Sequence, residues 1–242
     1  MGRQAYLGRN QKAVIKGGLA QLGERGLCKP EIAGSNPASS TKGKVMSKII
    51  VASLFDTKIP KNAIVVNTTS RSTDFGKELS PFFLGPVSLY DNYISKNVEN
   101  GWQYSKLYSA HADDNGCPTE SYYKWAGQGW SKSFADRYPM GKGKKPLCSV
   151  WKDKLLTYIE ARKQVYIPLY HQAVVGTTAF KSLKELASIE KDIYLLDFDA
   201  YRHEDIGMTM HDVINNPKKK MGHAFVLKLI LENTLNTKNV GM

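Results

Sequence analysis

The segment that most constrains the fold is the run from Ala224 to Leu235, which is apolar almost all round. A helix with apolar side chains on every side is stable only inside a core. We therefore expect this helix to lie centrally, with the other elements packed around it. The apolar side chains that support this expectation are Phe225, Val226, Leu227, Leu229, Ile230 and Leu231.

The other periodic segments predict a mixture of strands and helices. Short β-branched runs at 49–54 and 63–67 and the run 192–201 are typical of strands. Together with the helices, they predict a single α+β domain over residues 46–242, mainly helical with a small β-sheet. Helices are expected around Glu99, over 121–136, over 151–175 with a kink at Pro168, and over 178–187.

The first 45 residues show no sustained period and differ from the rest. Back-translated into codons, Gly17 to Lys42 can be written as a transfer RNA gene whose three stems close in one reading frame. We expect residues 1–45 to be a non-native, disordered leader, with the true start at Met46; the alternative is a basic leader that binds nucleic acid. Omitting its eight Lys and Arg and two Asp and Glu residues lowers the formal net charge from +12 to +6.

Cellular location is constrained by what the sequence lacks. No apolar run approaches the length of a membrane span. The three cysteines, Cys28, Cys117 and Cys148, are scattered and form no CxxC pair. This usage suits a reducing compartment, so a cytoplasmic protein is expected, in the host cell if a phage encodes it.

One helical segment places polar groups in a row. Because side chains four and seven apart share a helix face, Glu99, Gln103 and Lys106 would line up on one side. Val98, Trp102 and Ser105 form another stripe that could anchor this helix to the core. A carboxylate, an amide and an ammonium in a row could bind a polar ligand, or the face could simply be solvated.

The run 192–201 carries a second polar cluster. Alternation along a strand puts Asp197, Asp199 and Tyr201 on the same side. Two carboxylates at a strand end are costly to bury unless they are hydrogen-bonded or used. A metal site of Asp197 and Asp199 with His203 and His211 is an alternative, but the spacing matches no known ligand signature, and no metal is expected.

Basic segments supply candidate anion sites. Arg71 lies in a polar loop, where it could bind a phosphate or remain solvated. The loop 138–146 is rich in Gly and Lys but lacks the spacing of a P-loop. The lysines of 218–220 precede the central helix, whose N-terminus favours anions. Either a phosphate docks there, or the lysines lie outside the first turn.

Several of these motifs resemble one family. Leu79–Phe83 followed by Asn97–Lys106 resembles the opening of NADAR domains, the NAD- and ADP-ribose-associated N-glycosidases. Met221–Leu227 is similar to the closing helix of that family, and Trp151, before a helix with Arg162 and Lys163, is similar to its tryptophan-before-helix segment. The D-x-fWG motif is missing after Asp199, and 220–223 lacks the Asn of GxNxLG. The chain from Met46 also resembles a group of uncharacterised bacteriophage proteins.

The resemblance implies a NADAR-like fold and an N-glycosidase without a cofactor. Its substrate would be a small ADP-ribosyl or N-ribosyl nucleotide, or an ADP-ribosylated or otherwise modified nucleic acid. Its catalytic residues would be Glu99, Trp151 and Asp199, with Asp197 a close rival of Asp199. A carboxylate would stabilise the oxocarbenium-like sugar and a protonated carboxyl would assist the leaving base. The alternative is a non-catalytic phage protein that binds nucleotide or nucleic acid through its basic loops. The expected substrate-binding residues are Arg71, Gln103, Lys106, Asp197, Tyr201, Lys220 and His223.

Overall fold

The central element of the fold is a three-stranded parallel sheet. The computed structural model describes residues 48–239, so the expected leader lies outside the described residues. In this sheet β8 (Ile193–Asp197) lies between β1 (Ile49–Ser53) and β2 (Ile64–Asn67). All five residues of β8 are buried, as is typical of a central strand covered on both faces. The first two predicted strands are confirmed, whereas the third is shorter than 192–201.

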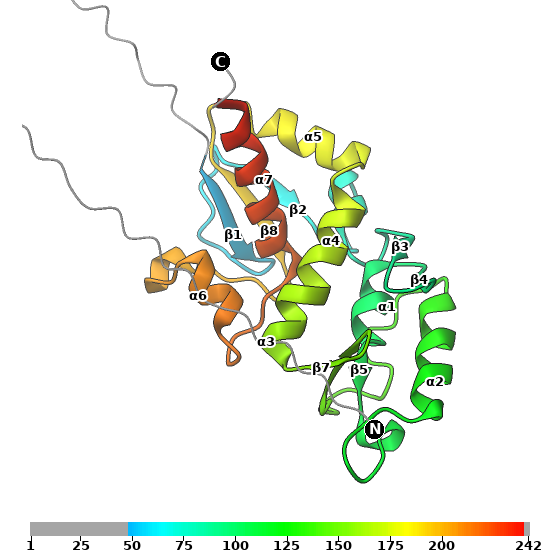
Figure 1. The fold of residues 1–242 in the computed structure, drawn as a ribbon. Helices are drawn as coiled ribbons and strands as arrows, with labels where there is room; N and C mark the ends of the chain where they lie inside the picture. The colour runs from blue at the N-terminus through cyan, green and yellow to red at the C-terminus, as the bar shows by residue number, and fades with distance from the viewer. Residues whose placement is uncertain (1–47, 240–242) are drawn as a thin grey trace, which may run out of the picture. The chain divides into compact units, whose positions relative to one another are not determined.

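The helix α7 (His223–Asn239) packs against this sheet and beside α4 (Ile167–Val174), as Figure 1 shows. Phe225, Val226 and Leu227 are fully buried, which confirms the central helix predicted from its apolar residues. Lys228 is the one charged residue buried in this run. Its Nζ donates to Ile49 O (2.6 Å) and Glu232 Oε1 (2.7 Å), so the charge is paired.

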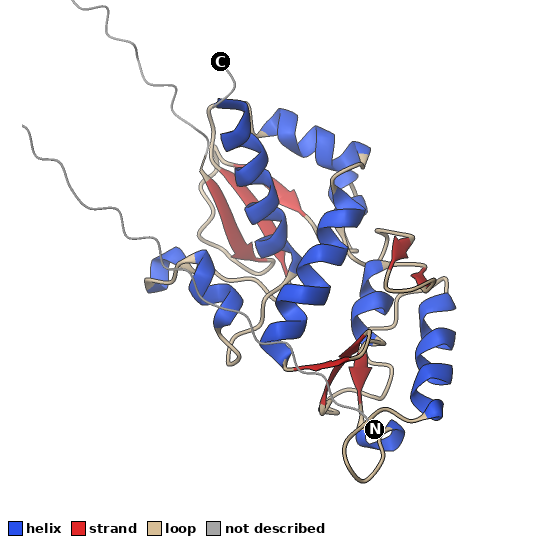
Figure 2. Cartoon of the chain, viewed as in Figure 1, coloured by secondary structure: helices blue, strands red, loops and turns tan. Residues whose placement is uncertain are grey.

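The remaining described elements are helices and short hairpins, giving a mixed α/β architecture with small sheets (Figure 2). Strands β3 and β4 form a two-stranded antiparallel sheet, and β5, β6 and β7 form a three-stranded antiparallel sheet. Among the helices of the described residues, none is both long enough and apolar enough to cross a membrane. The bounds of the other elements are η1 Phe75–Leu79, β3 Val87–Ser88, β4 Ile94–Ser95, α1 Val98–Gln103, β5 Lys106–Leu107, η2 Ser109–His111, α2 Glu120–Ser131, β6 Cys148–Trp151, β7 Lys154–Leu156, α3 Tyr158–Ala161, η3 Arg162–Tyr166, α5 Thr178–Leu186, η4 Glu204–Ile206 and α6 Met210–Asn215.

The expected helix over 151–175 was wrong in its first turns. Trp151 ends β6, and Lys152, with φ of 56°, makes the turn into β7. The helix begins only after Thr157, whose side chain forms a capping box with Glu160. A wider π-helical turn, η3, then precedes Pro168 at the start of α4, so the helix adjusts one turn before the proline.

Two other helices are shorter than predicted. The helix α1 is capped by the Asn97 side chain, which accepts from Asn100 N, and it ends at Gln103. Lys106 therefore belongs to β5 and not to the helix. The helix α2 ends at Ser131 instead of continuing to 136. The prediction over 178–187 is confirmed by α5.

Candidate active site

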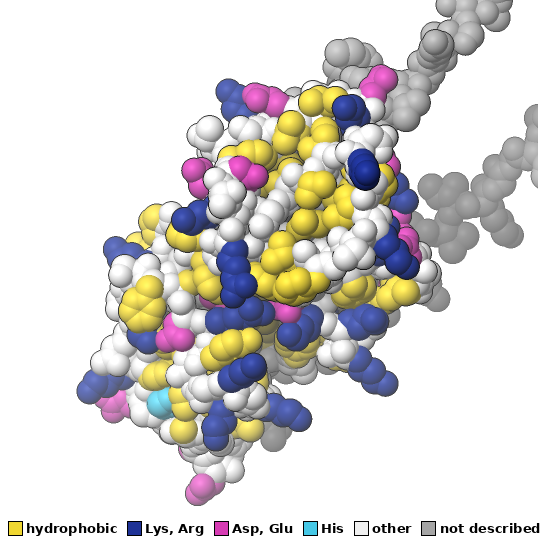
Figure 3. Space-filling model, turned by 180° about the vertical axis from the view of Figure 1, so that it is seen from behind, with side chains coloured by type: hydrophobic (Ala, Val, Ile, Leu, Met, Phe, Trp, Pro, Cys, Tyr) yellow, Lys and Arg dark blue, Asp and Glu magenta, His cyan; other side chains and the backbone are white. Residues whose placement is uncertain are grey.

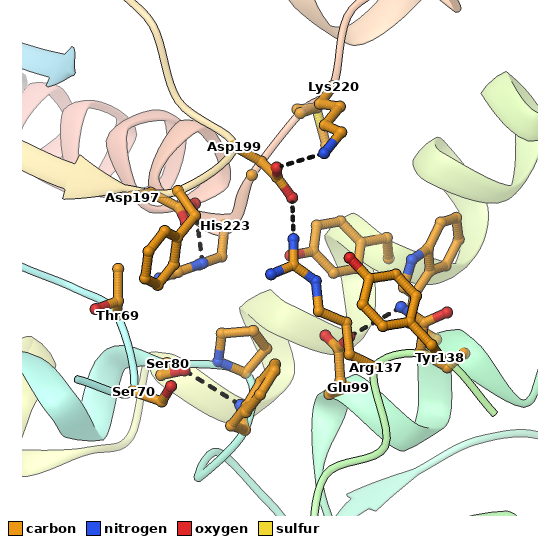
Figure 4. A pocket seen from close by; sticks show the side chains of 18 of the residues that line it. Thr69, Ser70, Ser80, Glu99, Arg137, Tyr138, Asp197, Asp199, Lys220 and His223 are labelled. Atoms are coloured by element: carbon orange, nitrogen blue, oxygen red, sulfur yellow. Dashed lines mark hydrogen bonds and ion pairs between the residues drawn. The ribbon is translucent and has the colours of Figure 1, made fainter. Parts of the chain in front are cut away.

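A cavity of about 370 Å³ lies at the carboxyl edge of the parallel sheet. Ligands of α/β sheets bind outside this edge, and the volume is in the range of small-molecule sites. Figure 4 shows side chains from several elements converging on it. The sheet side contributes Thr69, Ser70, Arg71, Asp197, Phe198, Asp199, Lys220, Met221, Gly222 and His223. The helical side contributes Ser80, Pro81, Phe82, Glu99, Trp102, Gln103, Lys106, Arg137, Tyr138, Tyr158, Arg162 and Tyr166.

On the helical side, Glu99, Gln103 and Lys106 form the row expected from their spacing. Gln103 Nε2 donates to Glu99 Oε1 (2.9 Å), and Lys106 Nζ donates to Gln103 Oε1 (2.6 Å). Lys106 is the first residue of β5, which begins three residues after the end of α1, and its side chain extends to the row from there. Its ammonium also lies over the Trp102 ring, 4.8 Å from the centroid. The contacts of the row were therefore predicted correctly, although its last member is not helical.

Burial changes the acidity of both ends of this row. Burial raises the pKa of Glu99 above its usual value, against the opposing effects of Gln103 and Lys106. Burial likewise lowers the pKa of Lys106 to about 8, although Glu99 favours the charged form. A carboxyl group whose pKa is raised by its surroundings can keep a proton and donate it. Glu99 is thus suited to act as a general acid.

On the sheet side, Asp197 and His223 form a buried ion pair. Asp197 Oδ2 lies 3.0 Å from His223 Nδ1, and it also accepts from Ala224 N (3.3 Å). Burial alone would raise the pKa of Asp197, but His223 lowers it to about 2. Burial would lower the pKa of His223, but Asp197 raises it above its usual value. The pair therefore favours a carboxylate and an imidazolium.

The other ring nitrogen of His223 faces Thr68. Nε2 lies 2.8 Å from both Thr68 Oγ1 and Thr68 O, and the threonine hydroxyl itself donates to Leu196 O (2.9 Å). The arrangement resembles an Asp-His-Thr triad. Thr68 is fully buried, however, and its hydroxyl proton is already donated to a carbonyl. We therefore interpret these contacts as fixing the start of α7 against the end of β8.

This close packing accounts for the glycine at position 222. A Cβ built there would collide with Asp197 Oδ2. The backbone just before α7 must therefore approach the carboxylate without a side chain, so the absence of a Cβ is the feature that allows Asp197 to reach His223.

Asp199 is held between cations from two different walls. Arg137 Nη2 lies 2.6 Å from Asp199 Oδ2, and Lys220 Nζ lies 2.9 Å from Oδ1. Figure 4 shows Arg137 reaching Asp199 from below, while Lys220 approaches it from the side. Arg137 is positioned through Asn100, because Asn100 Oδ1 accepts from Asp136 N (2.8 Å) and Asn100 Nδ2 donates to Phe134 O (2.9 Å).

Two further arginines line the cavity in different ways. The Arg71 guanidinium lies over the Phe198 ring at 5.0 Å and makes no ion pair with the described residues. Arg162 is buried and donates to the backbone oxygens of Val213, Ile214, Asn216 and Lys219. Arg162 therefore closes the end of α6 and holds the loop before Lys220, whereas Arg71 stays available to a ligand.

Two of the expected site residues, Trp151 and Tyr201, do not line this cavity. Trp151 packs edge-on against Tyr90, with ring centroids 5.0 Å apart. Tyr201 packs against Phe225, at 5.0 Å. The structure places Trp102 in the cavity wall instead. The expected residues that do line it are Arg71, Glu99, Gln103, Lys106, Asp197, Asp199, Lys220 and His223.

Sequence reasoning missed the aromatic wall and one cation. Trp102 was assigned to the anchoring stripe, although its position three residues after Glu99 placed it in the right segment. Tyr158 begins α3 and Tyr166 ends the π-helical turn that follows it, a turn that the sequence did not predict. Arg137 had no local signal, since its place depends on the distant Asn100.

The alternative metal site is not assembled. Among the described residues, no three His, Cys, Asp or Glu side chains are placed to share a metal ion. Asp197 is engaged by His223, and His203 packs edge-on against Phe225, with ring centroids 5.6 Å apart.

The model of one protein family matches residues 47–227, most of the chain. That family is described as a family of unknown function (DUF6939). No curated protein and no solved structure matches the chain.

Proposed function

Since the chain belongs to DUF6939, a family of unknown function, we propose a function from the site itself: hydrolysis of the N-glycosidic bond of an ADP-ribosyl or N-ribosyl nucleotide. One observation carries the proposal. Glu99, a buried carboxyl with a raised pKa, lines the same cavity as the differently held carboxylates of Asp197 and Asp199. A carboxyl group whose pKa is raised by burial can serve as the acid, and a second carboxylate in the same cavity can stabilise the positive charge that forms on the sugar.

The proposed reaction uses Glu99 as the proton donor. Glu99 gives its proton to the leaving base, the C1′–N bond breaks, and its electron pair stays on the base. The ribosyl cation that forms is stabilised by the Asp199 carboxylate, and water then attacks C1′ while its proton returns to Glu99. Each well-placed acid or base contributes about 10²–10⁴-fold to the rate.

The walls supply groups suited to such a substrate. Trp102 and Tyr166 pack with ring centroids 5.2 Å apart and present aromatic surface to the cavity, suited to a base or a ribose. Lys106 and Arg71 provide positive charge for phosphate oxygens. The resemblance of 79–83 and 97–106 to NADAR domains supports the same proposal, which includes a NADAR-like fold.

The test is to incubate the protein with a panel of ADP-ribosyl and N-ribosyl compounds and measure released base. We expect the kcat of Glu99→Gln to fall by about 10²–10⁴-fold. The substitution keeps the shape of the side chain but cannot supply the proton. Glu78→Gln, at an exposed position, serves as the matched control. Equal turnover by wild type and Glu99→Gln removes Glu99 from the mechanism, and no release from any compound contradicts a hydrolase.

A second candidate is a non-catalytic protein that binds nucleotide or nucleic acid through its basic loops. It is favoured by the exposed Lys142, Lys144 and Lys145, which follow the cavity residue Tyr138. Figure 3 shows Lys and Arg side chains gathering on one face of the molecule. Polymer binding of this kind weakens linearly with salt on a log–log scale, with a slope set by the number of phosphates contacted. A steep slope for single-stranded oligonucleotides, without base release, would favour this candidate.

A further inference from the structure

We propose that Arg137 and Lys220 form a phosphate-binding site, that the Asp199 carboxylate occupies it, and that a phosphate group of the substrate displaces this carboxylate. The identity of the substrate as a phosphorylated riboside rests on the proposed function, whereas the anion site itself rests on the geometry alone. The displaced Asp199 would then be free to face the ribose.

Arg137 and Lys220 are spaced so that each could bind one oxygen of the same phosphate group. Arg137 and Lys220 each bind a different oxygen of one carboxylate, at 2.6 and 2.9 Å. A phosphate group offers three oxygens and a higher charge in about the same space, so it can accept from both donors and leave one oxygen for a third. Lys220 comes from the chain just before α7, and Arg137 from the segment after α2.

The Asp199 side chain and its partners are partly exposed to solvent, whereas the Asp197 side chain and its partner are buried. The side chains of Asp199, Arg137 and Lys220 are 26%, 35% and 73% exposed, whereas those of Asp197 and His223 are only 6% and 7% exposed. Partly exposed ion pairs contribute little to stability, because water competes for both charges. Asp199 can therefore exchange for another anion, whereas Asp197 is fixed by its buried partner.

The backbone next to Arg137 and the backbone next to Lys220 are each fixed by a hydrogen bond. Both cations would therefore stay in place when Asp199 moves. The residue before Arg137 donates its N–H to Asn100, which is completely buried. The residue before Lys220 has its carbonyl oxygen bound by Arg162 Nη2 (3.1 Å). A site whose backbone is already fixed loses less conformational freedom when a ligand binds.

The same exchange would make the enzyme selective for phosphorylated substrates. While Arg137 and Lys220 hold Asp199, its carboxylate is engaged and cannot stabilise a developing ribosyl cation. A phosphate bound to the two cations would release it beside the sugar. We therefore expect a riboside that lacks the phosphate to be both a weaker ligand and a poorer substrate.

The test measures binding of ribose 5-phosphate and of ribose by calorimetry, with no requirement for turnover. We expect Asp199→Asn to bind ribose 5-phosphate about five- to tenfold more tightly than wild type, because the competing carboxylate is gone. Arg137→Gln should bind it about tenfold more weakly. The control, Asp56→Asn, removes an Asp–Arg pair of the same length, 2.6 Å, in which Arg202 is the partner. Its affinity for ribose 5-phosphate should equal that of wild type.

Unchanged or weaker binding of ribose 5-phosphate by Asp199→Asn would overturn the anion site. Lys220→Met provides a second weakening variant in case Arg137→Gln does not fold, and thermal melting checks the fold of each. Tighter binding by Asp199→Asn without base release from any compound keeps the phosphate site and rejects the hydrolase. Base release with no effect of these variants on binding keeps the hydrolase and rejects the site.

Discussion

The two walls of the cavity hold buried carboxyl groups in opposite ways. On the helical wall Glu99 meets the neutral amide of Gln103, and burial raises its pKa. On the sheet wall Asp197 is buried as well, but His223 lowers its pKa to about 2. Burial is therefore common to both groups, and the charge of the nearest partner decides whether the pKa rises, as for Glu99, or falls, as for Asp197.

The difference separates the carboxyl group that we propose as the catalytic acid from one with a structural role. Asp197 joins β8 to the first turn of α7, so its charge contributes to the fold. Glu99 makes one hydrogen bond to an amide and lines the cavity, so its ionisation is disfavoured and its proton can be used. Each of the following predictions can break or sharpen this contrast.

The largest expected effect on stability is from Asp197→Asn. It leaves His223 buried without its carboxylate, and breaking a buried pair from one side costs about 3 kcal/mol or more. Urea denaturation at pH 7 measures the free energy of unfolding. The control, Asp205→Asn, removes an exposed carboxylate 3.9 Å from Arg202 and should cost at most about 1 kcal/mol. Similar losses for both variants would contradict the structural role of Asp197.

The stability contributed by Asp197 should depend on pH in one direction. Because its pKa falls from the usual 3.8 to about 2 on folding, the carboxylate stabilises the fold at pH values above about 4. That contribution is lost as the pH falls through about 2. The unfolding free energies of wild type and Asp197→Asn should therefore converge in acid, and a constant difference between pH 5 and pH 2 would refute the lowered pKa.

Glu99→Gln should show the opposite trend with pH. A carboxyl group whose pKa is raised on folding lowers stability as the pH rises above its unfolded value near 4.5, because the folded chain must ionise a buried group. Gln cannot ionise, so the variant should gain stability relative to wild type as the pH rises from 4 to 7. Exposed Glu78→Gln should show no such gain, and a falling difference for Glu99→Gln would contradict the buried acid.

A smaller effect, on kcat/KM, should distinguish Trp102 in the cavity wall from Trp151 outside the cavity. Trp102→Phe trims aromatic surface from the cavity and should lower kcat/KM for a ribosyl substrate about three- to tenfold. Trp151→Phe alters a ring that packs on Tyr90 outside the cavity and should change kcat/KM less than twofold, about the scatter of such measurements. A larger loss for Trp151→Phe would return that residue to the site.

The smallest effect is expected from replacing Lys142, Lys144 and Lys145 together by Ser. These side chains are exposed and lie beyond the cavity wall, so kcat/KM for a small substrate should stay within about twofold. A tenfold loss of oligonucleotide binding in the same variant would instead support the binding protein. Steady-state kinetics and fluorescence anisotropy distinguish the two outcomes.

The parts of the fold that the sequence predicted depend on local patterns. The apolar run of 224–231 could only be a core helix, and the spacing of Glu99 and Gln103 placed them in contact. The region after Trp151 was predicted wrongly, because the turn at Lys152 and the capping box at Thr157 override a helical stripe. Tertiary contacts decided the rest of the site.

Arg137 shows why those contacts could not be predicted. Its position in the cavity is set by Asn100, 37 positions earlier in the chain, through hydrogen bonds to the backbone of its neighbours. The aromatic wall has a similar origin, since the π-helical turn of Arg162–Tyr166 begins after Tyr158, ends at Tyr166 and changes the spacing of the two side chains along the helix. Neither feature has a period or a motif that sequence reasoning can use.

The order of strands in the sheet has a consequence for synthesis on the ribosome. In the described part of the chain, β1 and β2 pair only with β8, which lies more than a hundred residues later. The two early strands emerge long before the strand that joins them, and such long-range pairing folds slowly and leaves strand edges exposed. A nascent chain that stops before Ile193 thus exposes two unpaired strands, which chaperones and proteases can bind.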